Sequence, residues 1–330
     1  MGKASKMAGM KWTRRGLGAA LMAPMLAHGQ APAWPNRPIR ILVPWAPGGG
    51  IDIIARAMAA RLSEALGQPV LVENKTGGGG IIGMGEAARA APDGYTLLAL
   101  DNSYTMLPHT TASLPWDHAR AFAPIALGGA GAFMLVVNAA APFATLKDLI
   151  AAAAQAPEKL SYGTGGMGSS PHFVMEAFQQ AARLRMLHVS YRGGAEAMLA
   201  VVAGQVDCSM ATISAARGQI AAGRLRALAI ASETRSDLVP EVPSFTEAGF
   251  PGFTGGIWGG LAAPSGTPKP ILDRLEAASL AALRHDDLKR AFGAQGLEPG
   301  TLGQEGFGAL IRTETARWGR VAAEAGITKQ

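Results

Sequence analysis

Short apolar runs alternate with longer amphipathic segments along most of the chain. The first run, residues 39–43, ends at Pro44. Three glycines then precede residues 51–66, where apolar positions recur every three or four residues. Such a run predicts a strand, and such a period predicts a helix with one buried face. The same order of strand, glycine turn and helix is then repeated.

The repeated pattern predicts an α/β protein with two lobes, each a mainly parallel sheet flanked by helices. The run 133–137 has no polar residue, which is typical of a parallel strand covered on both faces. The other expected strands are 70–72, 95–100, 160–163, 187–189, 206–210 and 225–231. The expected helices are 81–90, 145–156, 170–182, 195–203, 215–222, 270–282 and 307–325.

The chain length and a change in composition predict where the lobes begin and end. A second unit starts near Asn138, and from Pro240 the chain is rich in proline and glycine, which indicates a returning linker. Hinges are expected near Asn138 and Val239. The expected order is a signal peptide (1–30), lobe 1 (31–137), lobe 2 (138–239), and the return linker with the rest of lobe 1 (240–330).

The N-terminal segment has the pattern of a secretory signal peptide. An apolar run at 17–27, too short for a permanent bilayer span, is followed by small residues suitable for cleavage. An arginine pair also resembles a twin-arginine signal. The alternative is a disordered basic leader on a cytoplasmic protein, but we expect export to the periplasm. The basic residues are Lys3, Lys6, Lys11, Arg14 and Arg15.

Charge and cysteine content narrow the classes of function. The leader carries five of the formal +6 charges, and the rest of the chain has no Lys/Arg-rich run that would follow a nucleic-acid backbone. Cys208 is the only cysteine, so no internal disulfide can form. Residues 121–146 lack ionisable side chains, but prolines and glycines interrupt them, which disfavours a membrane span.

Three glycine turns that precede predicted helices, at 46–50, 165–170 and 191–194, are the main functional signal. A helix start presents unpaired N–H groups and a partial positive charge, so it binds anions without a basic side chain. Each contact contributes about 0.3–1 kcal/mol, whereas micromolar affinity needs about 8 kcal/mol. Micromolar binding therefore requires several helix starts and closure of a cleft. Taken singly, each of these turns is more readily explained as an ordinary connection between a strand and a helix.

A series of short motifs extends through most of the chain and begins at Trp34-Pro35-Asn36-Arg37-Pro38-Ile39. It continues, in order, through residues 43–52, 66–74, 92–97, 162–165, 189–193, 204–207, 222–229, 242–249 and 263–268. On these motifs the sequence resembles the substrate-binding proteins of tripartite tricarboxylate transporters, the Bug solute receptors. This resemblance implies a type II periplasmic-binding fold that holds a small carboxylate (a dicarboxylate, amino acid or aromatic acid) between the lobes. It also implies a membrane permease as partner; we expect a monomer.

The resemblance implies a set of ligand-binding residues on each lobe. One departure stands out: the family usually has threonine where this chain has Ile51, which predicts the loss of a hydroxyl donor at the ligand. Lobe 1 is expected to contribute Trp45, Ala46, Pro47, Gly49 and Asp52. Lobe 2 is expected to contribute Thr164, Gly165, Ser169, Ser170, His172, Tyr191 and Asp207.

Structural roles are the alternative for several of these residues. Asp52 suits a helix cap, because acidic residues favour the first turn, and Asp207 suits a turn. A histidine such as His172 is more often a partly exposed helix residue than a ligand contact. Trp45 and Trp258 are large enough to belong to a core.

Enzymatic functions have weaker support. Two stretches match G-x-G-x-x-G, and the first precedes a strand that ends at Asp101, so an NAD(P)-binding oxidoreductase is the alternative function. No acid–base pair accompanies these stretches. There is no G-x-S-x-G motif, and the histidines at 109, 118, 172, 188 and 285 lack metal-ligand spacing. We therefore expect no catalysis, cofactor or metal.

Overall fold

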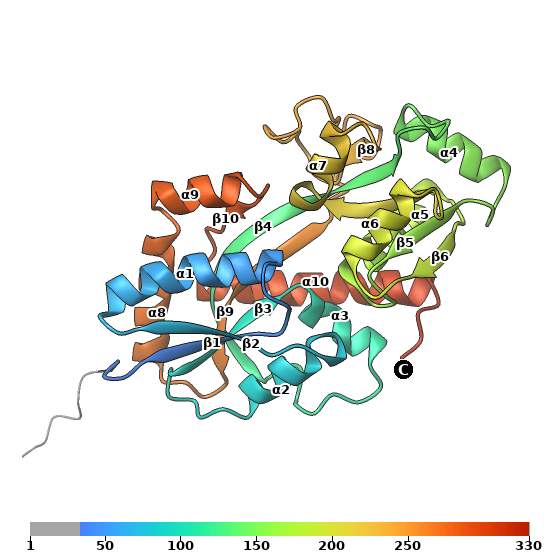
Figure 1. The fold of residues 1–330 in the computed structure, drawn as a ribbon. Helices are drawn as coiled ribbons and strands as arrows, with labels where there is room; N and C mark the ends of the chain where they lie inside the picture. The colour runs from blue at the N-terminus through green and yellow to red at the C-terminus, as the bar shows by residue number, and fades with distance from the viewer. Residues whose placement is uncertain (1–33, 330) are drawn as a thin grey trace, which may run out of the picture. The chain divides into compact units, whose positions relative to one another are not determined.

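The first sheet follows the predicted alternation of strands and helices. The computed structural model describes residues 34–329, and the predicted signal peptide lies outside them. β1 (Ile39–Val43) pairs in parallel with β2 (Val70–Asn74) and β3 (Thr96–Asp101), as Figure 1 shows. α1 (Gly50–Leu66) follows β1, and η1 (Gly78–Gly80) and α2 (Ile81–Ala88) follow β2. α1 is followed by its C-cap Gly67, whose φ of 68° is left-handed and suits glycine.

Two long strands, β4 (Phe122–Asn138) and β9 (Gly256–Pro264), connect this sheet with the second one. β9 lies antiparallel between β3 and β4. β4 pairs with β9 up to Ala132 and, from Phe133 onward, runs antiparallel to β7 (Cys208–Thr212) and β8 (Leu225–Ile230). The prediction of a parallel strand at 133–137 was therefore wrong in direction. β9 also occupies part of the segment that was predicted to be a linker.

The second sheet has the strand order β4-β7-β5-β6, with β8 on the other side of β4. β5 (Ser161–Thr164) runs parallel to β6 (Leu187–Ser190) and to β7. Its helices, close to their predicted positions, are α4 (Leu146–Gln155), α5 (Ser170–Ala182), α6 (Gly194–Val202) and α7 (Ile213–Ala221).

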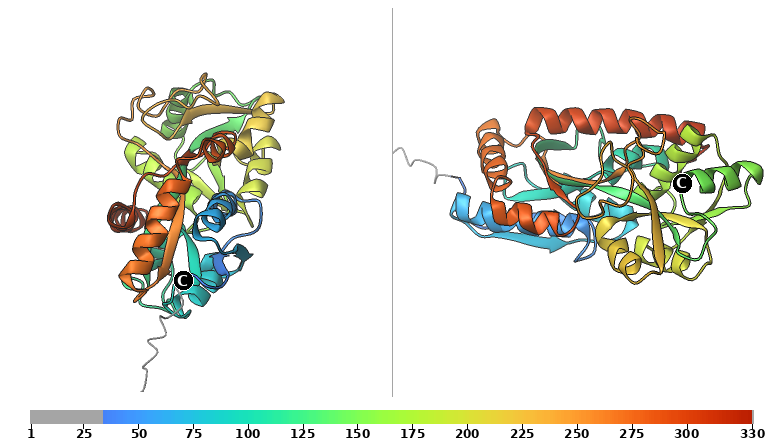
Figure 2. Two further views of the ribbon diagram at one scale, coloured as in Figure 1. Left: turned by 90° about the vertical axis from the view of Figure 1, so that its left-hand side faces the viewer. Right: turned by 90° about the horizontal axis from the view of Figure 1, so that it is seen from above.

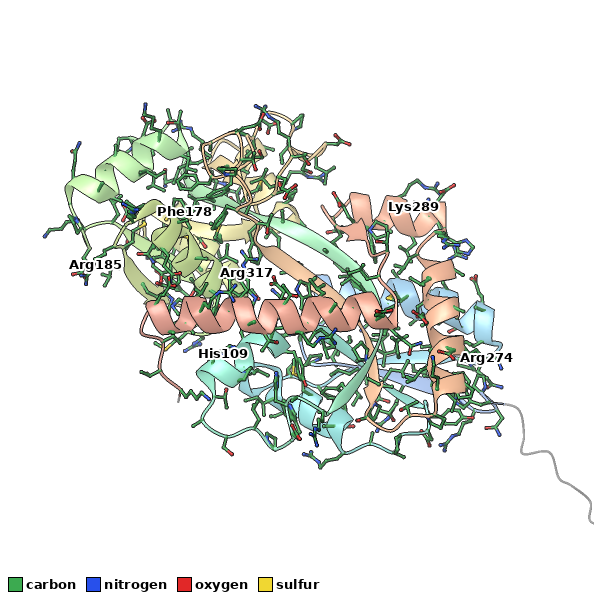
Figure 3. All side chains as sticks on the ribbon, turned by 180° about the vertical axis from the view of Figure 1, so that it is seen from behind. His109, Phe178, Arg185, Arg274, Lys289 and Arg317 are labelled. Carbon is green, nitrogen blue, oxygen red and sulfur yellow. The ribbon has the colours of Figure 1, made fainter. Side chains whose placement is uncertain are left out.

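The C-terminal helices pack against both sheets. α8 (Lys269–Ala282), α9 (Asp286–Gly293) and the short β10 (Glu298–Pro299) precede α10 (Gln304–Glu324). α10 contacts α3 (Ser103–Thr110), β4 and α5, and Figures 2 and 3 show it as one long helix beside these elements. The sequence pattern did not predict α3 or α9. Within residues 34–329, no helix combines the length and the apolar character that a bilayer crossing requires.

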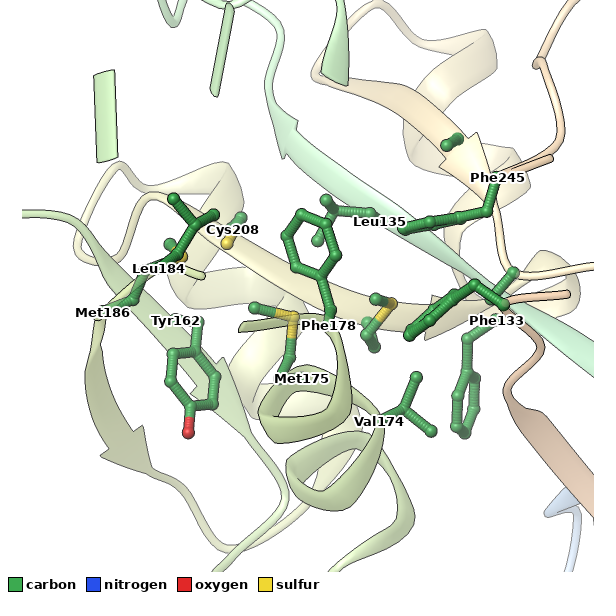
Figure 4. Packing of buried hydrophobic residues seen from close by; sticks show 14 of the residues in the cluster. Phe133, Leu135, Tyr162, Val174, Met175, Phe178, Leu184, Met186, Cys208 and Phe245 are labelled. Atoms are coloured by element: carbon green, nitrogen blue, oxygen red, sulfur yellow. The ribbon is translucent and has the colours of Figure 1, made fainter. Parts of the chain in front are cut away.

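The burial of β4 on both faces explains its apolar run. Phe133, Leu135 and Val137 pack in one core cluster with Phe178 of α5, shown in Figure 4. The alternate residues of the same strand pack in a second cluster, on the side of α6 and α7. Because each face meets its own core, the strand is continuously apolar although its neighbours are antiparallel.

Candidate functional site

The turn between β1 and α1 places backbone N–H groups at the start of a long helix. Gly49 is the N-cap of α1, and no side chain caps this start. Trp45, at the beginning of the turn, donates a hydrogen bond from Nε1 to the carboxylate of Asp101. Ala46 and Pro47 are exposed. The predicted residues of lobe 1 thus lie together, with the tryptophan ring fixed beside the helix start.

Asp52 holds this turn from inside. Its side chain is buried and accepts hydrogen bonds from Gly48 N at 2.9 Å, Arg56 Nε at 2.9 Å and Asn74 Nδ2 at 2.8 Å. Burial acts to raise the pKa of Asp52, but these bonds, led by the one from Arg56, hold the pKa below its ordinary value. Because its carboxylate is already satisfied within the chain, we assign Asp52 to shaping the turn.

Asp101 is the last residue of β3 and Asn102 follows it; neither was predicted as a ligand-site residue. Asp101 is 3% exposed and accepts from Trp45 and Ser103, so its carboxylate is not free for a ribose. Burial raises the pKa of Asp101 to about 6. Asn102 Nδ2 donates to Ser170 Oγ and to Gly256 O, both at 2.9 Å. The rule that ligand sites lie at the carboxyl ends of parallel strands could have indicated both residues.

The turn between β5 and α5 contains most of the predicted residues of lobe 2. Ser169 is the N-cap of α5, but its hydroxyl donates to Gly166 O at 2.7 Å and leaves the helix start uncapped. Thr164 is buried, and its Oγ1 lies 2.7 Å from His188 Nε2. Ser170 makes the bond to Asn102 described above. This turn therefore meets the β3 end directly.

His172 lies under the same turn and is only 4% exposed, so the partly exposed position considered above was wrong. Its Nδ1 accepts a hydrogen bond from Gly168 N at 3.2 Å. Burial, with a smaller contribution from His188, lowers the pKa of His172 to about 4. The ring is therefore neutral at pH 7 and contacts the turn from the protein side.

The third turn packs against the second. Gly193 is the N-cap of α6, again without a side-chain cap. Tyr191 N donates to Thr164 O at 2.9 Å. A Cβ on Gly165 would lie 2.8 Å from Gly194 N, so this close approach requires glycine. The starts of α5 and α6 are consequently neighbours.

Asp207 lies at the other end of β5. Its Oδ2 accepts from Ser161 N at 2.7 Å and from Ser161 Oγ at 2.9 Å, where β5 begins. Thr164 is the last residue of the same strand. The structure thus does not bring Asp207 together with the three turns.

The side chain of Ile51 belongs to the core. It is 7% exposed, within the cluster under the first sheet. A Cβ added to Gly259 would lie 2.9 Å from Ile51 Cδ1, so the side chain faces β9. The expected loss of a hydroxyl donor at this position stays a prediction. Trp258 is also a core aromatic, packed edge-to-face on Phe307.

The start of α7 was missed by sequence reasoning. Thr212 caps this helix by accepting from Ala215 N at 3.3 Å, and its Oγ1 lies 3.2 Å from Ser214 Oγ. Both residues line a cavity of about 30 Å³ that also touches Gly50 of α1. A Ser or Thr before a predicted helix is the signal that could have indicated it.

A larger cavity lies away from these turns. Its volume is about 340 Å³, and none of the predicted ligand residues lines it. Its walls come from α10 (Glu314, Arg317, Trp318), from residues 231–236 and from the β4–β9 crossing. Figure 3 shows Arg317 above α10. The larger cavity and the three predicted turns are therefore two different places in the structure. In residues 34–329, no cluster of three or more His, Cys, Asp or Glu side chains could hold a metal ion.

Comparison with known proteins identifies the family. Residues 54–327 match the family described as the tripartite tricarboxylate transporter family receptor. The chain belongs to this family. Its members are periplasmic solute-binding receptors, a role without catalysis. The resemblance and the two-lobe fold expected from the sequence are thereby confirmed.

Similar solved structures agree with this receptor fold. The periplasmic binding protein BugD is 31% identical, with 90% of this chain and 100% of that chain covered, at a TM-score of 0.77. An R. palustris protein with adipate is 30% identical, covering 90% and 100%, at a TM-score of 0.81. MatC from Rhodopseudomonas palustris, with bound malate, is 30% identical, covering 87% and 99%, at a TM-score of 0.76.

Proposed function

We propose that this receptor binds a small carboxylate, with a dicarboxylate as the first class to test, between the starts of α1, α5 and α6, and performs no chemistry on it. The observation that carries the proposal is that no side chain among residues 34–329 caps any of these three helix starts. Uncapped N–H groups and the helix dipole favour a carboxylate by about 0.3–1 kcal/mol per contact. A ligand with two carboxylates can use starts on both lobes.

At two of these starts, no contact among residues 34–329 requires glycine. Gly49 (φ −75°, ψ 165°) and Gly193 (φ −174°, ψ 166°) have extended backbones that other residues adopt easily. A Cβ on Gly193 would meet nothing within 4 Å, and one on Gly49 would meet only Ala46 O at 3.6 Å. The absence of a side chain there leaves the N–H groups open to a ligand.

The similar structures support the same ligand class. One holds adipate and another malate, and both ligands are dicarboxylates. Adipate and malate differ in length, so a site that binds one of them well needs a particular distance between its two carboxylate-binding positions. We therefore propose the dicarboxylate class for this protein, and the length of the ligand is to be measured.

Closure of the lobes is the proposed mechanism. The lobes are 31–137 with 240–330, and 138–239, with hinges near Asn138 and Val239. A ligand that contacts both lobes favours the closed form in proportion to its extra affinity for that form. The hydrogen bond from Asn102 to Ser170 joins the end of β3 to the start of α5, and so connects the two proposed lobes. Export to the periplasm, action as a monomer and delivery to a membrane permease complete the proposal.

The test is calorimetry of the purified exported protein with malate, adipate, glutamate, benzoate and NAD(H), and with Gly49→Ala and Gly193→Ala. We expect a dicarboxylate to bind, and each variant to weaken its binding at least about tenfold while unfolding as the wild type does. The matched control is Gly218→Ala on the exposed face of α7, which should leave Kd unchanged and raise stability by about 0.5–1 kcal/mol. Binding of NAD(H) alone would refute the proposal, and unchanged affinity in both variants would remove these glycines from the site.

A further inference from the structure

Two histidine side chains pack against the inner side of the turn between β5 and α5. His172 is on α5 and His188 on β6, and their ring centroids are 4.2 Å apart in a stacked arrangement. The His188 ring also stacks on Tyr162, with centroids 5.0 Å apart. Because the His172 side chain is packed below the turn, it is placed to act on the turn and not on a ligand above it.

Each imidazole makes one contact with the turn. His172 Nδ1 accepts from Gly168 N at 3.2 Å, and His188 Nε2 lies 2.7 Å from Thr164 Oγ1. Thr164 Oγ1 in turn contacts the carbonyl and the N–H of Gly166, at 3.2 and 3.3 Å. The two rings therefore hold the turn at its beginning and near its end.

The contact of His172 requires a particular tautomer. Nδ1 can accept only when it carries a lone pair, so the ring proton belongs on Nε2. Nε2 lies 3.9 Å from Glu176 Oε1, and that same oxygen accepts from Tyr162 Oη. The titratable groups facing His172 are thus Glu176 on its own helix, Tyr162 on β5 and His188 on β6.

We propose that His172 is a positioning residue for ligand binding: its neutral Nδ1 holds Gly168 N–H and keeps the turn in the shape that leaves the start of α5 uncapped. In this shape the Ser169 hydroxyl is occupied by Gly166 O and does not cap the helix. The inference rests on the proposed function, since it assigns a role within that site.

Two substitutions separate the hydrogen bond from packing. His172→Phe keeps a ring that can stack on His188 but has no acceptor. His172→Asn loses the ring but places an amide oxygen near the position of Nδ1. We expect Gly168 amide hydrogen exchange, followed by NMR without ligand, to accelerate in the Phe variant only. The Kd for malate or adipate at pH 7 should rise about fivefold in the Phe variant, as for one lost hydrogen bond, and stay near the wild-type value in the Asn variant.

Controls keep the two proposals separable. Urea unfolding of both variants checks that they fold, and His285→Phe, at an exposed position before α9, controls for the change of residue type. Unchanged Gly168 exchange in the Phe variant, or equal losses in both variants, would overturn the positioning role. If the wild type bound no carboxylate, the proposed function would fail, while the exchange measurement would still decide whether His172 holds the turn.

Discussion

Asp101 should lower the stability of this receptor as the pH rises, which is the reverse of the usual behaviour of a carboxylate. The side chain is 3% exposed at the end of β3. Burial raises its pKa from 3.8 to about 6, although the hydrogen bonds from Ser103 and Trp45 act in the opposite direction. The same carboxylate fixes Trp45 beside the start of α1, so its protonation state belongs to the architecture of the site.

The sign and size of the contribution of Asp101 to the free energy of unfolding follow from proton linkage. Between pH 3.8 and about 6 the folded chain holds a proton on Asp101 that the unfolded chain has lost, so the free energy of unfolding falls as pH rises. A shift of about two pKa units corresponds to about 3 kcal/mol. This contribution is fully present below pH 3.8 and is lost as pH rises through 6. His172 and His118, whose pKa values burial lowers to about 4, act oppositely, because stability is lost as pH falls from 6.5 towards 4.

Asp101→Asn isolates the effect, because asparagine does not titrate. Urea unfolding followed by circular dichroism should be measured for both proteins from pH 4 to pH 7.5. The free energy of unfolding of the wild type minus that of the variant should fall by about 2.5 kcal/mol over this range, because part of the full contribution of about 3 kcal/mol is already lost at pH 4. The amide group facing Trp45 Nε1 shifts the difference by a constant and does not change its slope. A difference that stays flat with pH would show that Asp101 has an ordinary pKa and would refute the reasoning.

Two further predictions concern packing. Gly165→Ala should destabilise the protein by about 1–3 kcal/mol, because its Cβ would lie 2.8 Å from Gly194 N; an unchanged melting temperature would contradict this contact. Phe178→Ala should cost about 3–5 kcal/mol, because the ring is fully buried among Phe245, Phe250 and Phe253. Urea titration measures this cost, and a loss below about 1 kcal/mol would mean that the core collapses to fill the space.

The sequence alone determined the strand–helix alternation, the two-lobe class and the positions of the helix starts at which we propose the site. These features are local: the period of apolar residues and the glycine turns encode them directly, so β1, α1, β5 and α5 were found close to their predicted positions. β9 was missed for the opposite reason. Gly256, its first residue, was counted with the linker, whereas the crossing with β4 requires glycine there and again at Gly260. A Cβ on Gly256 would lie 2.0 Å from Gly131 O, and one on Gly260 would lie 2.4 Å from Ala126 O.

Only the tertiary structure decided what the site residues do. Asn102 meets Ser170 across 68 positions of the chain, and no periodicity encodes such a pair. Asp52 and His172 were predicted as ligand contacts, but packing turned both inward, where each holds a glycine N–H of its turn. Ile51 lies in the core for the same reason. Which face of a helix start is buried depends on the elements packed against it. The sequence therefore identified the turns, whereas the tertiary structure determined which of their side chains point into the protein.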